Sequence, residues 1–158
     1  SGPSAGPQRV IHPWDGSAFA GAKLAAVIDG HILTYRRDRK PGIPWPGRID
    51  LPGGGREGDE SPAACALREC HEEFGIAIEA RRIVWARAFA SSDLPGGTSW
   101  FLVAPISAAE VAAMRFGDEG HSPQLLGLGA FLGHSEAIPS QQARLRQALA
   151  ALGWAMAG

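Results

Sequence analysis

Runs of apolar residues broken by turn-forming residues predict several strands along the chain. Residues 18–28 are almost all small or apolar and end at Asp29-Gly30, and residues 31–36 alternate more between apolar and polar side chains. Two such runs joined by Asp-Gly predict a β-hairpin. Further strands are predicted at residues 49–51, 83–90 and 99–106.

Two stretches combine helical apolar spacing with helix end signals. Residues 61–74 start with Ser61, a good N-cap, and Pro62, which suits the first helical position. Gly75 suits the left-handed residue that follows a helix. The second helix, residues 140–152, is predicted to carry one apolar side formed by Leu145, Leu149 and Leu152.

The order of these elements predicts the fold class. Residues 107–114 predict a short helix, and residues 124–132 are apolar and ambiguous, with part of them expected to be strand. Strands, a helix, more strands and a final helix predict an α/β fold with a mixed central sheet packed between helices. We expect residues 1–9 to be disordered and residues 10–158 to form one domain.

Composition narrows the classes of partner. The 158 residues include 15 basic and 16 acidic side chains, which gives a net charge of -1. This balance offers no electrostatic footprint for duplex nucleic acid or an anionic membrane, but a small phosphorylated ligand needs only local charge.

Cysteine use and hydropathy suggest a compartment. Cys65 and Cys70 lie five residues apart on one predicted helix, on different faces, so we expect no bridge between them. Two thiols without metal-type spacing, no apolar run long enough for a membrane span and no secretion signal favour the cytoplasm.

The helix predicted at residues 61–74 carries a candidate metal site. At about 100° per residue, one apolar stripe is formed by Ala63, Leu67, Cys70 and Phe74. On the opposite side, an arc of about 100° holds Glu69, Glu72 and Glu73. Crowded carboxylates repel one another, and Mg²⁺, which binds oxygen ligands and bridges to phosphates, relieves that repulsion. An acidic face that only contacts solvent is the competing interpretation.

Two neighbouring features favour the metal site. A loop with three glycines at positions 53–55 precedes the helix and lets backbone approach a ligand or a helix closely. Arg68 lies inside the acidic segment and can hold carboxylates in a fixed geometry; its simpler role is an intrahelical ion pair.

These residues resemble the Nudix box, G-x5-E-x7-R-E-U-x-E-E-x-G-U, where U is aliphatic. The segment from Gly54 to Ile76 reads GGREGDESPAACALRECHEEFGI and matches every fixed position. A chance match at one starting point has a probability on the order of one in 10⁸. The one departure is Cys70 in an aliphatic position, where cysteine behaves as a small hydrophobe.

The resemblance implies a Nudix-type α/β/α sandwich and an Mg²⁺-dependent hydrolase, with Mn²⁺ as the alternative ion. It assigns metal binding to Glu69, Glu72 and Glu73, and we favour Glu69 as the general base. It gives Arg68 the task of orienting a carboxylate. It gives supporting roles in the box to Gly54, Gly55, Glu60 and Gly75, of which Glu60 is expected to pair with Arg68 and the two loop glycines to lie against the site.

Many relatives add a distal carboxylate from a later loop. Glu119, in a flexible Gly-Asp-Glu-Gly sequence, is the preferred fourth metal ligand, because functional residues favour such loops. Glu110, in the predicted short helix, and Asp118 are the other candidates.

Substrate recognition has several candidates ahead of the box. Arg36, Arg37, Arg39 and Arg48 are basic residues that can meet phosphates, and we select Arg36 and Arg48; a solvated basic loop is the alternative. Trp45 and Trp100 can stack on a base, although packing is the commoner role, and His121 can contact substrate or face water.

The predicted activity is hydrolysis of a diphosphate linkage in a small nucleotide-like substrate, such as a nucleoside triphosphate or a nucleotide sugar. The competing hypothesis is a catalytically inactive domain of the same fold that senses a nucleotide or binds a protein. Removal of a 5′ pyrophosphate from RNA is a third option, which the lack of basic excess disfavours. A homodimer stays open.

Overall fold

The computed structural model describes residues 9–91, 94–115 and 123–154. The strands are β1 (Val10–Ile11), β2 (Gly21–Ile28), β3 (His31–Arg36), β4 (Ile49–Asp50), β5 (Gly53–Gly55), β6 (Trp85–Ala90), β7 (Thr98–Pro105) and β8 (Gln124–Gly127). The helices are α1 (Pro62–Phe74), the 3-10 helix η1 (Ala80–Arg82), α2 (Ala108–Ala112), α3 (Leu128–Leu132) and α4 (Pro139–Leu152). Of residues 1–9, which were expected to be disordered, only Arg9 is among the described residues.

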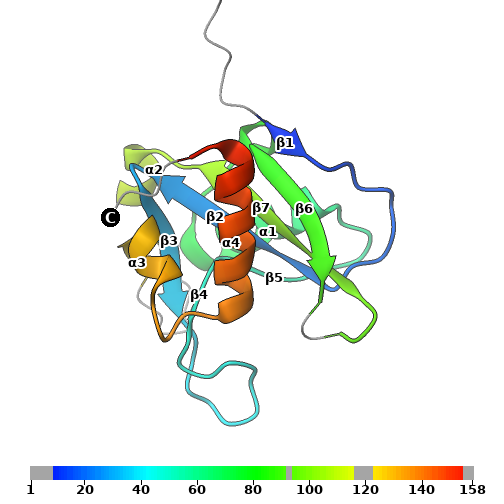
Figure 1. Ribbon diagram of the computed structural model, residues 1–158, viewed down its shortest axis with the longest axis horizontal. Helices are drawn as coiled ribbons and strands as arrows, with labels where there is room; N and C mark the ends of the chain where they lie inside the picture. The colour runs from blue at the N-terminus through cyan, green and yellow to red at the C-terminus, as the bar shows by residue number, and fades with distance from the viewer. Residues whose placement is uncertain (1–8, 92–93, 116–122, 155–158) are drawn as a thin grey trace, which may run out of the picture.

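The strands form one mixed sheet, as predicted (Figure 1). Its order is β1-β6-β7-β2-β3-β4, with β5 added to β2 and β8 added to β3. The pairs β1–β6 and β2–β7 are parallel, and the other pairs are antiparallel. Because β2 lies between β7 and β3 in this order, it is the strand around which the sheet is built.

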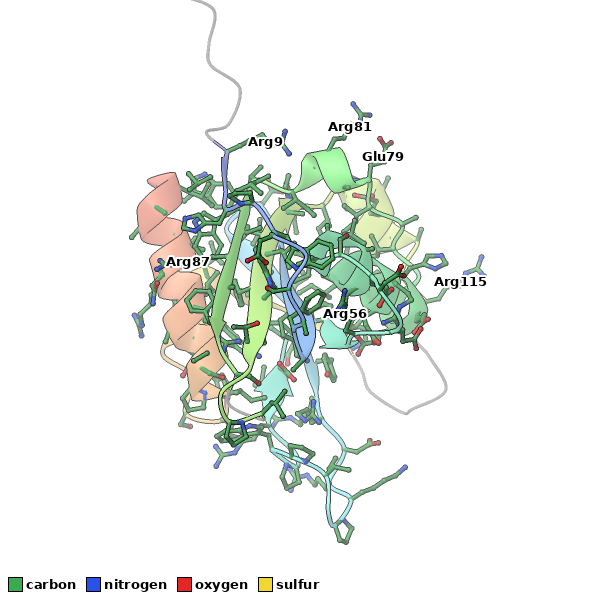
Figure 2. The ribbon with its side chains drawn as sticks, turned by 90° about the vertical axis from the view of Figure 1, so that its right-hand side faces the viewer. Arg9, Arg56, Glu79, Arg81, Arg87 and Arg115 are labelled. Carbon is green, nitrogen blue, oxygen red and sulfur yellow. The ribbon has the colours of Figure 1, made fainter. Side chains whose placement is uncertain are left out.

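Helices cover both faces of the sheet, which confirms the α/β/α sandwich (Figure 2). Leu24 and Ala26 of β2 belong to the cluster that contains Cys70 and Phe74 of α1. The alternate residues Ala25 and Val27 belong to the cluster that contains Leu145, Leu149 and Leu152 of α4. Since side chains alternate along a strand, a strand buried on both faces is largely apolar, which explains why residues 18–28 are apolar or small apart from Lys23.

The hairpin and the main helix end where the sequence predicts. Asp29 and Gly30 have φ of 47° and 72°, which is the backbone of a tight turn between β2 and β3. Ser61 caps α1 by accepting from the amide of Ala64 at 3.1 Å. Gly75 ends α1 with φ of 71°.

Three elements were not predicted, and each lacks a strong side-chain signal. β1 has two residues, η1 has three, and β5 consists of Gly53–Gly55, which pairs with Gly21–Lys23 of β2. A Cβ at Gly21 would lie 2.4 Å from the carbonyl oxygen of Gly54. The two segments therefore approach more closely than residues with side chains allow. The ambiguous residues 124–132 divide into β8 and α3.

Two other expectations concern thiols and membranes. Cys65 and Cys70 are both buried and free, so the prediction that they form no bridge is confirmed. Among the described helices, none is long and apolar enough to cross a membrane.

The Ser61 cap gives a direct test of the start of α1. We expect Ser61→Ala to lower the free energy of unfolding by about 1 kcal/mol, because it removes the acceptor of the Ala64 amide. For a domain of this size, the midpoint of thermal unfolding falls by about 2–4 °C. Ser135→Ala, at an exposed loop position, is the control and leaves the midpoint unchanged. An equal midpoint for both variants would contradict the capping role.

Candidate active site

Helix α1 packs directly on the glycine strand β5. A Cβ at Gly54 would lie 2.6 Å from Cδ of Glu69 and 2.8 Å from both of its carboxylate oxygens. The thiol of Cys65, on the same side of α1, donates to the carbonyl oxygen of Gly54 at 3.6 Å. The missing side chain at position 54 is therefore what makes room for the Glu69 carboxylate against the backbone.

Arg68 connects the carboxylates of this region. Its guanidinium donates to both oxygens of Glu60, from Nε at 2.7 Å and Nη2 at 3.0 Å. Nη1 donates to Glu69 at 2.9 Å and to Glu72 at 3.2 Å, and Nη2 also donates to the carbonyl of Gly55 at 3.0 Å. These bonds raise the pKa of Arg68, with Glu60 as the main cause, and the pairing of Glu60 with Arg68 expected from the sequence is present.

The acidic arc lies beside the buried face of α1, which differs from the helical-wheel prediction. The stripe buries Cys70 and Phe74 as expected, but Cys65 and Ala66 are also fully buried. Ala63 and Leu67 are only partly buried. The arc is therefore next to the sheet rather than opposite it, because β5 offers backbone without side chains at the point of contact.

Glu73 is a partly buried carboxylate of the arc. Its Oε1 accepts from the amide of Gly53 at 3.0 Å. Burial raises the pKa of Glu73 to about 7, although the Gly53 amide and the ammonium group of Lys23 act in the opposite direction. A cation bound beside this carboxylate would favour its charged form and offset the free-energy cost of its burial.

A cleft of about 310 Å³ opens beside β5. Its walls come from β2 and β5, from the loop between β3 and β4, and from the first turns of α4. The polar and aromatic side chains of its lining include Lys23, Arg37, Trp45, Asp50, Gln141 and Arg144. Trp100 also lines the cleft but is 6% exposed, so it is mainly a core residue, whereas Trp45 is 39% exposed.

A buried ion network forms part of this cleft. Asp50, which is 1% exposed, accepts from Nζ of Lys23 at 2.8 Å and from Nη1 of Arg37 at 3.1 Å. Burial opposes the charge on Lys23, but Asp50, with Tyr35 and Glu73, acts in the opposite direction and the pKa of Lys23 lies above its usual range. Arg37 also donates from Nε to the carbonyl of Pro44 at 2.9 Å. The network therefore connects the loop that carries Trp45 to the sheet.

Sequence reasoning missed Lys23 and Asp50, although a signal was present. Lys23 is the only charge within residues 18–28, and Asp50 is the only charge in the short strand predicted at residues 49–51. A lone charge in a buried strand needs a partner, so each indicated the other. Gln141 and Arg144 gave no comparable signal, because polar residues are common in a helix.

The structure directs Arg36 and Arg48 away from the cleft. Arg36 donates to the carbonyl of Gly47 at 2.8 Å and pairs with Glu136. Arg48 donates to the carbonyl of Ser135 at 3.1 Å. The cleft is lined instead by Arg37, which pairs with Asp50, and by Arg144.

The candidates for a distal carboxylate differ in outcome. Glu110 forms a capping box with Ser107 at the start of α2 and accepts two bonds of 2.6 Å from Arg82. Arg82 lowers the pKa of Glu110 to about 2, so Glu110 is a structural residue. Glu119, Asp118 and His121 lie outside the described residues.

The donor set of the arc fits a hard divalent cation. Among the described residues, no three carboxylate, imidazole or thiol groups converge on one point. Two of the arc's carboxylates, those of Glu69 and Glu72, nevertheless meet at the single atom Nη1 of Arg68. All the side-chain donors are carboxylate oxygens, the ligands that Mg²⁺ and Mn²⁺ accept.

The contact between Gly54 and Glu69 predicts a sharp difference between neighbouring glycines. Gly54→Ala should lower catalytic turnover by about 100-fold or more, because its Cβ displaces the Glu69 carboxylate. Gly55→Ala is the matched control, since its Cβ would meet nothing closer than 3.9 Å. Steady-state kinetics and thermal unfolding of both variants test the contact, and equal effects at the two positions would contradict it.

The raised pKa of Glu73 predicts the pH dependence of stability in metal-free protein. Between about pH 4.5 and pH 7 the folded protein binds more protons at Glu73 than the unfolded chain, so stability falls as pH rises. Glu73→Gln keeps the acceptor for Gly53 but has no charge. Its stability should exceed that of the natural protein by about 1–3 kcal/mol at pH 8 and by little at pH 5, measured by urea unfolding with chelator. A difference that does not grow with pH would contradict the assignment.

Comparison with known proteins agrees with this geometry. The NUDIX domain family matches residues 20–135 of the chain. No curated protein matches the sequence. Among solved structures, a bifunctional NMN adenylyltransferase/ADP ribose pyrophosphatase from Francisella tularensis, complexed with AMP and Mn ion, superimposes with a TM-score of 0.69 at 19% identity. That match covers 90% of this chain but 44% of the bifunctional protein, so this chain spans less than half of its length.

Two smaller solved structures match over nearly their whole length. The MutT NUDIX hydrolase from Burkholderia pseudomallei has a TM-score of 0.62 at 22% identity, over 89% of this chain and 98% of that one. The MutT protein from Methanosarcina mazei Go1 has a TM-score of 0.60 at 19% identity, over 91% and 95%. These structures show the shared fold. Because the family match spans most of the chain and contains the glycine strand, Arg68 and the acidic arc, the chain belongs to the NUDIX domain family.

Proposed function

We propose that the protein hydrolyses a diphosphate linkage in a nucleoside diphosphate derivative, such as a nucleoside triphosphate or a nucleotide sugar, with Mg²⁺ bound. One observation carries this proposal: Arg68 holds the carboxylates of Glu69 and Glu72 on the helix that packs against the glycine backbone of β5, and that backbone lines a cleft. None of the arc's side chains lines the cleft itself, so the proposal places the diphosphate at the Gly53–Gly55 wall, where Gly54 contacts Glu69 and the arc can supply oxygen ligands to a metal–diphosphate complex.

The metal ligands in this proposal are Glu69, Glu72 and Glu73, with Glu119 as the fourth. When bound, a divalent cation neutralises diphosphate oxygens and lowers the pKa of a water molecule. The burial of Glu73 supports its place in the set, because its charge needs a positive neighbour at neutral pH.

The chain's own groups account for orientation and proton transfer. Arg68 donates to Oε1 of Glu69, which holds the carboxylate in one orientation and leaves Glu69 as the general base that takes a proton from water. Glu60 accepts two parallel hydrogen bonds from Arg68, so the loop between β5 and α1, which carries Glu60, is fixed to α1. The backbone of Gly53–Gly55 forms the adjacent cleft wall.

The cleft also has the charge that a phosphorylated ligand requires. Lys23, Arg37 and Arg144 bring three positive charges against the single negative charge of Asp50, which leaves a net charge of +2 on the side chains that line the cleft. In a partly buried wall this charge is screened less than on an open surface. The similar structures add support: one is a bifunctional NMN adenylyltransferase/ADP ribose pyrophosphatase complexed with AMP and Mn ion.

A substrate panel with matched variants tests the proposal. Nucleoside triphosphates, nucleotide sugars and other nucleoside diphosphate derivatives are incubated with Mg²⁺ or Mn²⁺, and the nucleoside phosphates that form are separated and quantified by chromatography. Glu69→Gln and Glu72→Gln should each lower turnover by about 10²–10⁴-fold, because a neutral amide neither takes the proton nor binds the cation well. Glu79→Gln is the control; Figure 2 shows Glu79 beside Arg81 at η1, and the two form an ion pair.

The outcome separates the proposal from its alternative. Nucleotide binding without turnover of any substrate, with either ion, would favour a nucleotide-sensing or protein-binding domain. Turnover that survives both substitutions would remove Glu69 and Glu72 from the mechanism. The homodimer stays a prediction.

A further inference from the structure

The buried stripe of α4 changes character along the helix. Towards the C-terminus the stripe is apolar and packs on the sheet through Leu145, Ala148, Leu149 and Leu152. At the N-terminal end the same stripe continues with Gln141 and Arg144, which are 6% and 7% exposed. This end of α4 lines the cleft. Polar residues at core positions of an otherwise regular helix are a departure that a functional site explains.

Gln141 has an unsatisfied hydrogen-bonding atom. Its Oε1 is buried and accepts no hydrogen bond, and it is the only such side-chain atom among the described residues. Folded proteins rarely leave a buried polar atom without a partner, because its lost hydration is then not replaced. The neighbouring Gln142 shows the usual situation: its Nε2 donates to the carbonyls of Phe131 and His134, each at 2.9 Å.

Arg144 cannot be repositioned easily to satisfy Gln141. Its Nη2 donates to the carbonyl of Ala90 at 2.9 Å, and its guanidinium lies 5.0 Å from the ring centroid of Phe89. The partner for Gln141 is therefore expected to come from a molecule in the cleft, and that molecule has to present an N–H or O–H group.

A second feature of the cleft selects the kind of molecule. Trp45 lines the cleft, is 39% exposed and has φ of 51°, a left-handed backbone that bulky residues rarely adopt. Two hydrogen bonds hold this turn. The backbone amide of Arg48 donates to the carbonyl of Trp45 at 3.3 Å, and Nε of Arg37 donates to the carbonyl of Pro44. Strain of this kind persists where the surrounding structure imposes it, often at ligand sites. The exposed indole offers a flat surface for a planar ring.

We propose that the cleft region lined by Trp45 and the first turns of α4 binds the nucleobase of the substrate, with Trp45 stacking on the ring and Gln141 accepting a hydrogen bond from an exocyclic amine. This inference rests on the proposed function, because the same cleft includes the Gly53–Gly55 wall beside the acidic arc. One ligand thus reaches both regions: its diphosphate lies at β5 and its base at α4. A cleft of about 310 Å³ matches the lower range of small-molecule sites.

The experiment compares nucleoside 5′-diphosphates that differ by one amine. The pairs are ADP with purine riboside diphosphate, GDP with IDP, and CDP with the 4-deamino pyrimidinone riboside diphosphate. Isothermal titration calorimetry with Mg²⁺ gives the Kd for each. The natural protein should bind the amine-bearing member of at least one pair on the order of 10-fold more tightly, since its partner leaves Gln141 unpaired.

Two glutamine variants separate recognition from folding. Gln141→Leu should reduce the discrimination to near unity and leave the thermal midpoint unchanged or higher, because an unsatisfied polar group is removed. Gln142→Leu should retain the discrimination and lower the midpoint, because it removes two bonds to backbone carbonyls. Should Gln141→Leu fail to fold, Gln141→Asn withdraws the carboxamide by one methylene and provides the same comparison.

Two Trp45 variants test the stacking surface. Trp45→Ala should weaken binding of both members of the discriminated pair on the order of 10-fold, because the ring loses its stacking partner. Trp45→Phe keeps an aromatic face and should retain most of the affinity.

The results distinguish this inference from the proposed function. The inference is overturned if the natural protein binds both members of every pair equally, or if Gln141→Leu discriminates as well as the natural protein. If both proteins still hydrolyse substrate, the proposed function stands. Absence of turnover by the natural protein overturns the proposed function, while discrimination in Kd that Gln141→Leu abolishes still supports the base site.

Discussion

The ion pairs of Arg68 are the interaction on which the acidic arc depends. One guanidinium binds both oxygens of Glu60, one oxygen each of Glu69 and Glu72, and the carbonyl of Gly55. Without it, the carboxylates would repel one another on a single helix face. The Arg68 guanidinium holds these carboxylates together and fixes the loop between β5 and α1 to α1. Arginine suits this task because its donors are arranged in a rigid, planar fork.

The glycines of β5 set the second constraint. A helix normally packs on a sheet at a distance set by side chains on both elements, but here Gly54 has none and Glu69 approaches the backbone directly. The same absence of side chains allows β5 to pair closely with Gly21 of β2. The contact between Gly54 and Glu69 thus places the acidic arc against the glycine strand, and the same strand lines the cleft. The buried pair of Lys23 and Asp50 then connects the cleft to the strand at the centre of the sheet.

The elements with strong local signals were predicted well. The Asp29-Gly30 turn and the Ser61 and Gly75 ends of α1 are decided by backbone preferences of a few residues, which do not depend on distant contacts. The apolar periodicity placed Leu145, Leu149 and Leu152 in the core. The stripe on α1 was predicted less well. A helical wheel assumes that burial follows apolar side chains, whereas the neighbour of α1 is partly bare backbone.

Local sequence was sufficient for the box, the main helices and the class of chemistry, because each of these depends on residues close together in the chain. The contents of the cleft were decided only by tertiary structure. Lys23, Asp50, Trp45 and Gln141 come from separate segments and meet because β2, β4, a loop and α4 converge there. Arg36 and Arg37 are adjacent and equally basic, yet Arg37 lines the cleft and Arg36 pairs with Glu136 outside it. Their different ion-pair partners, Asp50 for Arg37 and Glu136 for Arg36, make that choice, and which partner each arginine meets depends on how distant segments pack.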